Sequence, residues 1–264
     1  MAGIVTLTTD FGMRDPYVAA MKGVILSICP HVHLHDLSHD ISPHDVWEAS
    51  FFLCSVLPYY PQGATHVVVV DPQVGSQRKA LVAKVLGQFI VCPDNGILTF
   101  ALRRYSVEQA YFIENPHYML PHVSKTFHGR DIFAPAAAHI ISCGGIPTNI
   151  GSPTSDYVCL EIPQPHFVKP AHIIGEVIHV DRFGNVISNI SPKDIGNDRI
   201  REVRCGDVPV STFVETYSDV TPGEMLSLWN SAGFLEIAAN CDNAAQRLNV
   251  KRGTVVEVLL SEGI

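Results

Sequence analysis

The sequence predicts an α/β protein: an N-terminal α/β domain with a central, mostly parallel sheet, followed by a smaller C-terminal all-β barrel domain. Three observations support this class. Over about the first 140 residues, short β-branched runs alternate with segments of helical periodicity. The run THVVVVD at 65–71 is continuously apolar, as in a parallel strand covered on both faces. From His172 onward, short strand-like runs separated by turn signals dominate.

The N-terminal elements follow in order. Residues 4–9 (IVTLTT) predict a strand, and Asp15-Pro16 then offers a helix N-cap and a first-turn proline. The helix has apolar residues at helical spacing, namely Val18, Met21, Ile25 and Ile28. A second strand is expected around 32–37. Asp45, with Glu48 three residues later, resembles a capping box that opens a helix over 46–57.

The next strands are expected at 65–71, 81–86 and 88–92, and an alanine-rich buried helix at 131–142. Proline and glycine then interrupt the pattern, which favours a connection rather than regular elements. We therefore predict an N-terminal α/β domain at 1–150, a proline-rich linker at 151–170 and a C-terminal β-barrel domain at 171–264. Its strands are IIGEVIHV, VISNI, EMLSLW and GTVVEVLL.

Composition limits the possible functions. The 264 residues are 47% hydrophobic and carry a formal net charge of −8, which disfavours nucleic acid as a partner. Seven cysteines without a C-x-x-C pair predict reduced thiols rather than disulfides or a thiolate metal site. Neither a signal peptide nor a membrane span is evident, so a cytoplasmic protein with no membrane partner is expected.

The stretch HVHLHDLSHDISPHD at 31–45 is rich in histidine and aspartate, which suggests a metal site. His31, His33 and His35 would share one face of a strand. The opposing interpretation is that these are polar strand and loop residues, and no metal is our prediction. A histidine-dependent metalloenzyme remains an alternative.

Other polar clusters end apolar runs, where an α/β sheet usually binds its ligands. They are TTDFGMRD (8–15), VVVVDPQVGSQRK (67–79), CPDNGILT (92–99), TFHGRDIFAP (126–135), HVDRFGNVISNI (179–190) and LWNSAGFLEIA (228–238). A single aspartate at such a place is more often a turn cap. The number of clusters favours a binding site.

These stretches resemble those of the S-adenosylmethionine (SAM) hydroxide adenosyltransferase family, from Thr8 to about Gly253. The family is related to the fluorinases and chlorinases. The resemblance implies hydrolysis of SAM to adenosine and L-methionine by in-line attack of water or hydroxide on ribose C5′. It also implies the two-domain fold above, no cofactor, and a homotrimer with active sites between subunits.

By position, the resemblance implies a catalytic trio of Asp71, Arg78 and His128. These residue types suit the chemistry, since water is a poor nucleophile that must be oriented and deprotonated. Arginine can hold a carboxylate bidentately, and histidine can accept a proton near neutral pH. Halogenases have tyrosine at the position of Asp71, so the loop favours a hydrolase.

The resemblance also implies substrate-binding residues. Asp10 would grip the ribose hydroxyls, Asp181 the methionine ammonium, Asn185 the adenine edge, Ser231 the methionine carboxylate and the backbone near Cys241 the adenine. The further pocket residues implied are Asp15, Tyr17, His44 and Glu236. For Asp181 and Asn185, a structural turn built by RFGN is the alternative. Phe11, Tyr17 and Phe183 could stack on substrate or simply pack in the core.

Two other function classes stay open. One is a SAM- or adenosine-binding sensor without turnover. The other is a chloride-using, halogenase-like enzyme, which Asp71 disfavours.

Overall fold

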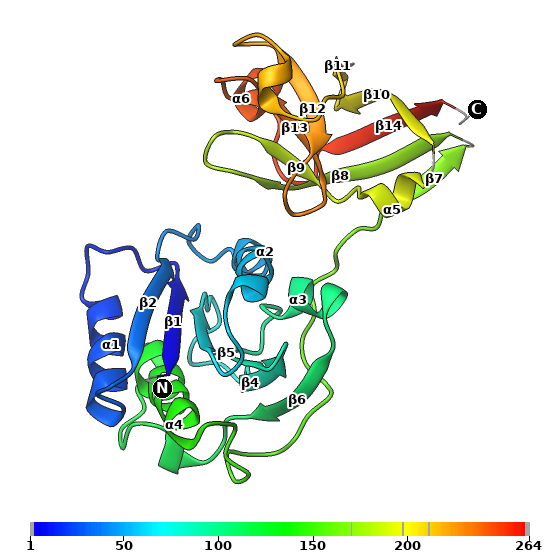
Figure 1. The fold of residues 1–264 in the computed structure, drawn as a ribbon. Helices are drawn as coiled ribbons and strands as arrows, with labels where there is room; N and C mark the ends of the chain where they lie inside the picture. Colours follow the sequence, from blue (N-terminus) through cyan, green and yellow to red (C-terminus); the bar gives the residue numbers. More distant parts are fainter. Residues whose placement is uncertain (1–2, 170, 197, 211, 262–264) are drawn as a thin grey trace. The chain divides into compact units, whose positions relative to one another are not determined.

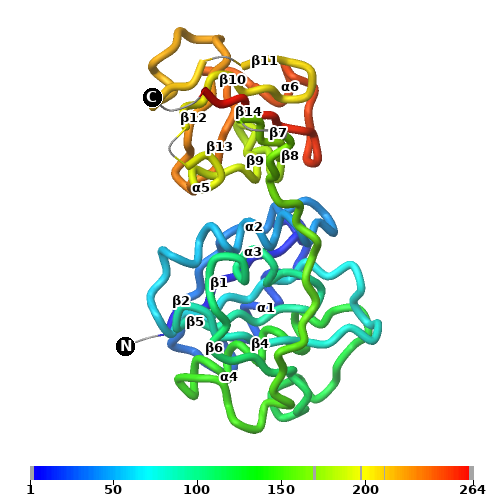
Figure 2. The backbone as a smooth tube through the Cα atoms, turned by 90° about the vertical axis from the view of Figure 1, so that its right-hand side faces the viewer, coloured from blue at the N-terminus to red at the C-terminus, as the bar shows by residue number. Residues whose placement is uncertain are grey.

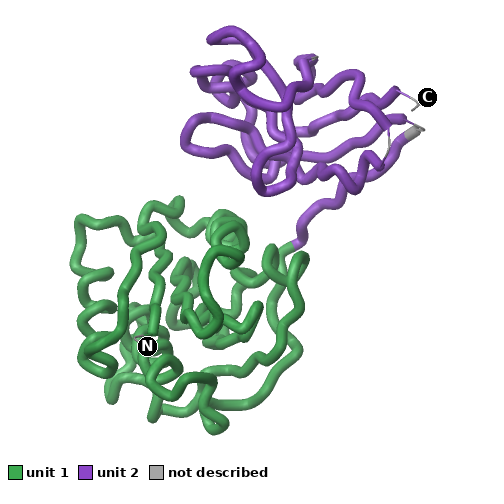
Figure 3. Tube along the Cα trace, in the orientation of Figure 1, with its two compact units in different colours: residues 1–160 green, residues 161–264 purple. Residues whose placement is uncertain are grey.

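A computed structural model describes residues 3–169, 171–196, 198–210 and 212–261. The chain divides into two compact units, residues 1–160 and 161–264 (Figure 3). Each unit is described by itself below. Within the described residues, no helix combines the length and apolar character needed to cross a membrane.

The first unit contains a six-stranded sheet with the order β2-β1-β3-β5-β4-β6 (Figure 1). Neighbouring strands from β2 to β5 run parallel, and β4 and β6 add antiparallel partners. The predicted mostly parallel sheet is therefore confirmed. The strands are β1 (Ile4–Thr9), β2 (His33–Ser38), β3 (Thr65–Val69), β4 (Ala80–Val85), β5 (Gln88–Pro93) and β6 (Val107–Phe112).

Helices cover both faces of this sheet. On β3, Val67 and Val69 pack in a cluster with residues of α1 and α4, whereas Val68 packs on the opposite face with residues of α2 and α3. The helices α2 and α3 lie side by side (Figure 2). This two-sided burial explains why β3 is continuously apolar. The helices are α1 (Tyr17–Ile28), α2 (Val46–Val56), α3 (Thr99–Arg104) and α4 (Ala134–Cys143), with short turns η1 (Leu57–Tyr59) and η2 (Pro116–Tyr118).

The helix starts agree only in part with the sequence signals. Asp45 caps α2 as predicted, because its carboxylate accepts a 3.0 Å hydrogen bond from the Glu48 N–H. The Glu48 side chain bonds the Ser42 N–H instead of the cap residue. The expected Asp15 cap is wrong: Pro16 holds the N-cap position of α1, without a side-chain cap.

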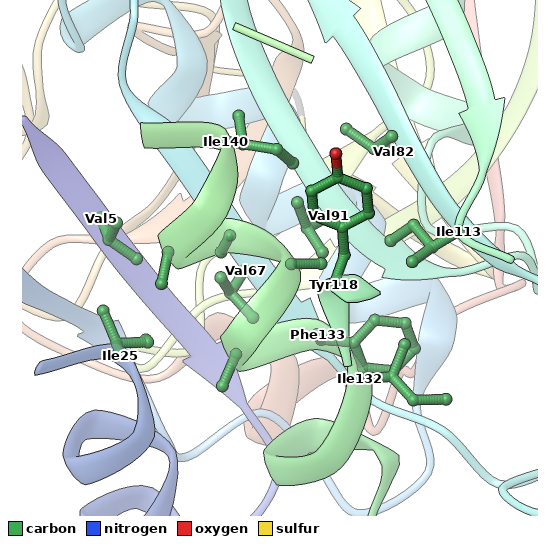
Figure 4. Close-up of a cluster of buried hydrophobic side chains, with 14 of the residues drawn as sticks. Val5, Ile25, Val67, Val82, Val91, Ile113, Tyr118, Ile132, Phe133 and Ile140 are labelled. Atoms are coloured by element: carbon green, nitrogen blue, oxygen red, sulfur yellow. The ribbon is translucent and has the colours of Figure 1, made fainter. Parts of the chain in front are cut away.

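The alanine-rich helix also starts differently from the prediction. A π-helical turn, η3 (Gly129–Phe133), precedes α4, and the Ala134 N–H bonds the Gly129 carbonyl five residues back. Phe133 and Ile140 extend from η3 and α4 into the core beside Val67, Val82 and Val91 of the sheet (Figure 4). The turn therefore lies between His128 and a helix that is fixed by core packing.

The second unit is mainly antiparallel and barrel-like, with the strand order β11-β10-β14-β8-β9-β13-β12 and β7 paired to β8. Its interior is a separate apolar cluster that includes Ile173, Val203, Ile237 and Val258. The predicted β-barrel class is confirmed. The elements are β7 (His166–Lys169), β8 (His172–Val180), β9 (Val186–Ser188), α5 (Pro192–Ile195), β10 (Arg199–Cys205), β11 (Val208–Val210), η4 (Tyr217–Asp219), β12 (Met225–Trp229), β13 (Leu235–Ala239), α6 (Ala244–Leu248) and β14 (Val255–Ser261).

Candidate active site

Two carboxylates follow the ends of neighbouring parallel strands in the first unit. Asp10 comes directly after β1, and Asp71 is the second residue after the end of β3. Thr9 and Val69 are register partners, so both carboxylates lie at the same edge of the sheet. This is the edge at which open α/β sheets bind ligands.

Asp71, Arg78 and His128 form one connected group. The Arg78 Nε donates to both oxygens of Asp71 at 3.0 Å, and Nη2 of Arg78 also bonds Asp71. The same Nη2 lies 2.8 Å from Nδ1 of His128. The side chains of Arg78 and Asp71 are only 4% and 6% exposed. A buried ion pair with this many hydrogen bonds holds a defined geometry.

A glycine brings the two loops of this group together. Gly75 has φ +79°, and a Cβ built on it would lie 2.2 Å from the backbone oxygen of Lys125. Only glycine fits both the left-handed conformation and this close approach. The loop that follows β3 is thereby packed against the segment that leads to His128.

His128 is kept neutral by its surroundings. Burial and the Arg78 charge lower its pKa from the ordinary 6.5, while the charges of Asp71 and Asp131 and a hydrogen bond to the Ser124 backbone raise it in part. An arginine always donates, so Nδ1 of His128 accepts and the neutral ring carries its proton on Nε2. The group therefore presents a carboxylate and a neutral imidazole bridged by a fixed cation.

A hollow of about 310 Å³ adjoins this group. Among the sequence-predicted site residues, it is lined by Asp10, Tyr17, His44, Asp71 and His128. Arg78 hydrogen-bonds two of these lining residues, Asp71 and His128. Asp15 is exposed and is not part of the lining.

Asp10 and His44 are joined at the rim of this hollow. The His44 N–H donates to Asp10 Oδ2 at 2.9 Å, and His44 adopts φ +68° while its side chain is 76% exposed. The aromatic rings of Phe11, Tyr17 and Phe127 contact one another, with centroids 5.2 to 5.9 Å apart. The hollow thus combines the Asp10 carboxylate, an aromatic wall and the group formed by Asp71, Arg78 and His128.

The second unit has its own hollow, of about 590 Å³, lined by Asp181, Asn185 and Cys241 from the predicted set. Asp181 Oδ1 accepts from the N–H groups of Phe183 and Asn185, and Oδ2 accepts from the Asn185 amide at 3.0 Å. The proposed structural turn is therefore real, and both residues build it. They line the hollow in addition.

Gly184 lets this turn pack closely. It has φ +85°, and a Cβ on it would lie 2.1 Å from the side chain of Asn243. The turn is thereby held against the start of α6, which follows the segment that contains Cys241.

Glu236 is 3% exposed and lies outside the lining, as does the exposed Ser231. Glu236 reaches the hollow indirectly, because the Tyr217 hydroxyl donates to it at 2.5 Å and Tyr217 is a lining residue. Burial raises the pKa of the Glu236 carboxyl, and the hydrogen bonds from Tyr217 and Asn230 oppose the shift only in part.

Sequence reasoning missed several residues that line the two hollows. Thr126 and Phe127 stand in the motif TFHGRD, for which the resemblance implies a role only for His128. Tyr217 and Asp242 gave no signal, since an isolated polar aromatic or aspartate in a β-rich segment is unremarkable.

The histidines of the stretch at 31–45 do not gather around one site. His33 and His35 are exposed on β2 at the edge of the sheet, whereas His39 is buried and contacts Thr9 at 2.8 Å. Across the described ranges, no cluster of three or more His, Cys, Asp or Glu side chains is arranged to hold a metal ion.

Comparison with known proteins identifies relatives over both units. The SAM hydroxide adenosyltransferase N-terminal domain matches residues 5–151, and the C-terminal domain of that family matches residues 175–257. The (R)-S-adenosyl-L-methionine hydrolase of Thermus thermophilus is 37% identical, covering 95% of this chain and 97% of the relative. That of Methanocaldococcus jannaschii is 34% identical, covering 97% and 95%.

Fluorinases are more distant: that of an Actinoplanes species is 27% identical, with 97% of each chain covered. A crystal structure of an uncharacterized conserved protein from Thermotoga maritima is similar with a TM-score of 0.87 and 39% identity. It covers 97% of this chain and 99% of the other.

Proposed function

Because the chain belongs to the SAM hydroxide adenosyltransferase family and is an S-adenosyl-L-methionine hydrolase like its relatives, we propose that Asp71, Arg78 and His128 activate the attacking water. The observation that supports this most directly is the buried hydrogen-bonded bridge from Asp71 through Arg78 to His128. It lies beside a hollow at the ligand-binding edge of the sheet.

The reaction makes its main demand on the nucleophile. Cleavage of the sulfonium at C5′ releases neutral methionine, so the leaving group needs no proton. Bulk water has a pKa of about 15.7 and must lose a proton to become an effective nucleophile. Asp71 is the proton-accepting member of the trio, because Nδ1 of His128 already accepts from Arg78 and Nε2 of His128 carries the ring proton. The fixed charge of Arg78 between them stabilises a hydroxide-like nucleophile. In-line placement of that water behind C5′ supplies the remaining acceleration.

We assign the nucleoside side of the substrate to the first hollow. Asp10 would accept hydrogen bonds from the vicinal ribose hydroxyls, because a carboxylate has two acceptor oxygens. The bond from the His44 backbone to Asp10 would hold that carboxylate in place. Tyr17 would face the sulfonium, which an aromatic face favours. The exposed Asp15 is assigned to the pocket entrance.

We assign the adenine and amino-acid groups to the second unit. Asn185 would meet the adenine edge together with the backbone near Cys241, and Asp181 would pair with the methionine ammonium. Ser231 would bind the methionine carboxylate, with Glu236 acting through Tyr217. The hollow lined by Asp181, Asn185, Tyr217 and Cys241 supports this assignment.

We further propose that a homotrimer completes the site. In it, the first hollow of one subunit would face the second hollow of the next subunit. Each hollow carries a part of the predicted residue set, and the two lie in different compact units.

The test is to incubate the protein with SAM in ¹⁸O-labelled water and to follow products by chromatography and mass spectrometry. Adenosine with ¹⁸O at the 5′ position and unlabelled L-methionine are expected. Asp71→Asn should abolish both products while SAM binding, measured by calorimetry, persists. Unlabelled adenosine would refute attack of water at C5′, and full activity in Asp71→Asn would refute the trio.

Related measurements separate the other function classes. A SAM-binding sensor would bind without forming products. A halogenase-like enzyme would form 5′-chloroadenosine in molar chloride, which we do not expect. A metalloenzyme would lose activity on treatment with a chelator and would contain metal in stoichiometric amount.

A further inference from the structure

Asp131 is a buried carboxylate close to His128 that the proposed reaction does not use. It is 0% exposed and lies in the π-helical turn η3 that begins directly after His128. Its oxygens accept from the Ser124 N–H at 2.8 Å, the Ser124 hydroxyl at 2.6 Å and Nε of Arg130 at 2.6 Å. A buried carboxylate is costly unless donors surround it, and these three donors meet that need.

These bonds fix the segment that carries His128. The Leu120 N–H donates to the Asp131 carbonyl at 2.8 Å, and the Asp131 N–H donates to the Phe127 carbonyl at 3.1 Å. The Ser124 hydroxyl also accepts from the Phe127 N–H at 3.1 Å. Asp131 therefore joins three points of the loop before His128 to the turn after it.

Ser124 connects this arrangement to the imidazole ring. The His128 ring hydrogen-bonds the backbone of Ser124, and Asp131 holds Ser124 through both its N–H and its hydroxyl. The ring is thus held on one side by Arg78 and on the other by the loop that Asp131 anchors.

One positive and two negative side chains act on His128. Arg78 and Asp71 face it from the loop after β3, and Asp131 faces it from its own turn. Asp10 and His44 line the same hollow with Tyr17. Burial and Arg78 favour the neutral ring, whereas Asp71 and Asp131 favour protonation. Asp131 differs from Asp71 because it does not line the hollow.

We propose that Asp131 is the positioning residue of His128: it holds the ring in place through Ser124, and its negative charge offsets that of Arg78. This inference rests on the proposed role of His128 in the reaction. Asp131 does not line the hollow, so its contribution is to the orientation and protonation state of His128.

The test combines kinetics with a direct titration of His128. The ring ¹³C resonances are followed by NMR against pH in the full-length protein. Because the chain has 13 histidines, the His128 signal is assigned by its loss in His128→Gln. In Asp131→Asn we expect the His128 pKa to fall below that of the wild type. We also expect kcat to fall about tenfold, the scale of one lost charged hydrogen bond, with KM within about twofold.

Arg130→Gln is the matched control. It removes a donor from the same carboxylate but keeps the negative charge and the bonds to Ser124, so the His128 pKa should not fall. Ser124→Ala is the second variant in case Asp131→Asn does not fold. It removes one of the Ser124 bonds to Asp131, and it should lower kcat with KM unchanged.

An unmoved His128 titration in folded Asp131→Asn would overturn the inference, as would equal losses of kcat in Asp131→Asn and Arg130→Gln. If Asp131→Asn does not fold, an unchanged kcat in Ser124→Ala overturns it. The failure of the proposed function would look different, since the wild type would then not hydrolyse SAM, or His128→Gln would retain full activity. The NMR titration does not depend on turnover and separates the two results.

Discussion

Arg78 donates a hydrogen bond across 2.8 Å to Nδ1 of His128, a residue 50 positions later in the chain. A guanidinium only donates hydrogen bonds, so the imidazole nitrogen must accept. Protonation of His128 would place two donors face to face and break this contact. The neutral state of His128 is therefore part of the geometry of the group.

Substituting Arg78→Lys should strongly reduce turnover although it keeps the charge. An ammonium cannot reproduce the planar fork that bonds Asp71 and His128 together. We expect kcat to fall about 100-fold, comparable with the loss of one preorganised donor in other enzymes, with KM within about threefold. Initial rates of adenosine release measure this. Lys79→Gln, which changes the neighbouring exposed cation, should retain wild-type kcat, and a similar loss there would contradict the specific role of Arg78.

The pH dependence of kcat should reflect the neutral state of His128. Its pKa lies below the ordinary 6.5, so the active form persists as the pH falls from 8 to 6.5. Activity should decline only below that range, when protonation breaks the bond from Arg78. The measurement is kcat at saturating SAM between pH 4.5 and 8. An acid limb centred at or above pH 6.5 would be inconsistent with the desolvated, Arg78-bonded ring.

The proposed trimer predicts complementation between defective chains. Asp71→Asn damages the first hollow, and Asn185→Ala damages the second, so each variant alone should be inactive or very weak. When the two are co-expressed with different tags and the mixed trimer is purified through both tags, about one third of the sites would combine two intact halves. Activity near that fraction of the wild type is expected. A mixed oligomer as inactive as its parents would show that each site belongs to a single chain.

His66 should make the first unit sensitive to mild acid. It is fully buried on β3, with Nδ1 2.8 Å from the Thr6 hydroxyl and Nε2 2.7 Å from the side-chain amide oxygen of Gln88. Burial lowers its pKa to about 4. An unfolded chain binds a proton at His66 below about pH 6.5 while the native state does not, so stability falls as the pH drops from 6.5 to 4. The loss from this group reaches about 3 kcal/mol.

The measurement is urea unfolding at pH 7 and pH 4.5, followed by Trp47 fluorescence in a Trp229→Phe background so that only the first unit reports. His66→Gln should be less stable at pH 7 but should lose less stability between the two pH values. Equal pH dependence in both proteins would show that His66 is not the responsible group.

Much of the fold could be predicted because local signals agreed with tertiary burial. The run at 65–71 is apolar on both faces, and β3 has helices on both sides. Asp45 has a helix directly after it and caps that helix. The prediction of Asp15 as the N-cap of α1 was wrong because Pro16 occupies that position. The buried hydrogen bonds of His66 could not be predicted from the sequence, because its partners Thr6 and Gln88 belong to two other strands.

Site residues could be predicted only where they stand in a sequence motif whose residues have assigned roles. The trio stands in two short motifs, and the structure brings its members into contact. Asp131 belongs to one of those motifs, yet its function depends on Ser124 and on a π-helical turn, neither of which leaves a periodic pattern. For Asp181 and Asn185 the sequence offered a structural turn and a binding role as alternatives. Both hold, because the two residues bond each other within the turn and also line the hollow of the second unit.

The π-helical turn η3 has a consequence for insertions and deletions. Its hydrogen bond spans five residues, one more than in an α-helix, and the core holds α4 on its C-terminal side. Deleting one residue from 129–133 would restore ordinary α-helical spacing and rotate the preceding residues by about 100° around the helix axis. His128 would then point away from Arg78 although no member of the trio had changed. The number of residues in this turn therefore determines the geometry of the proposed catalytic group as much as the identity of its side chains does.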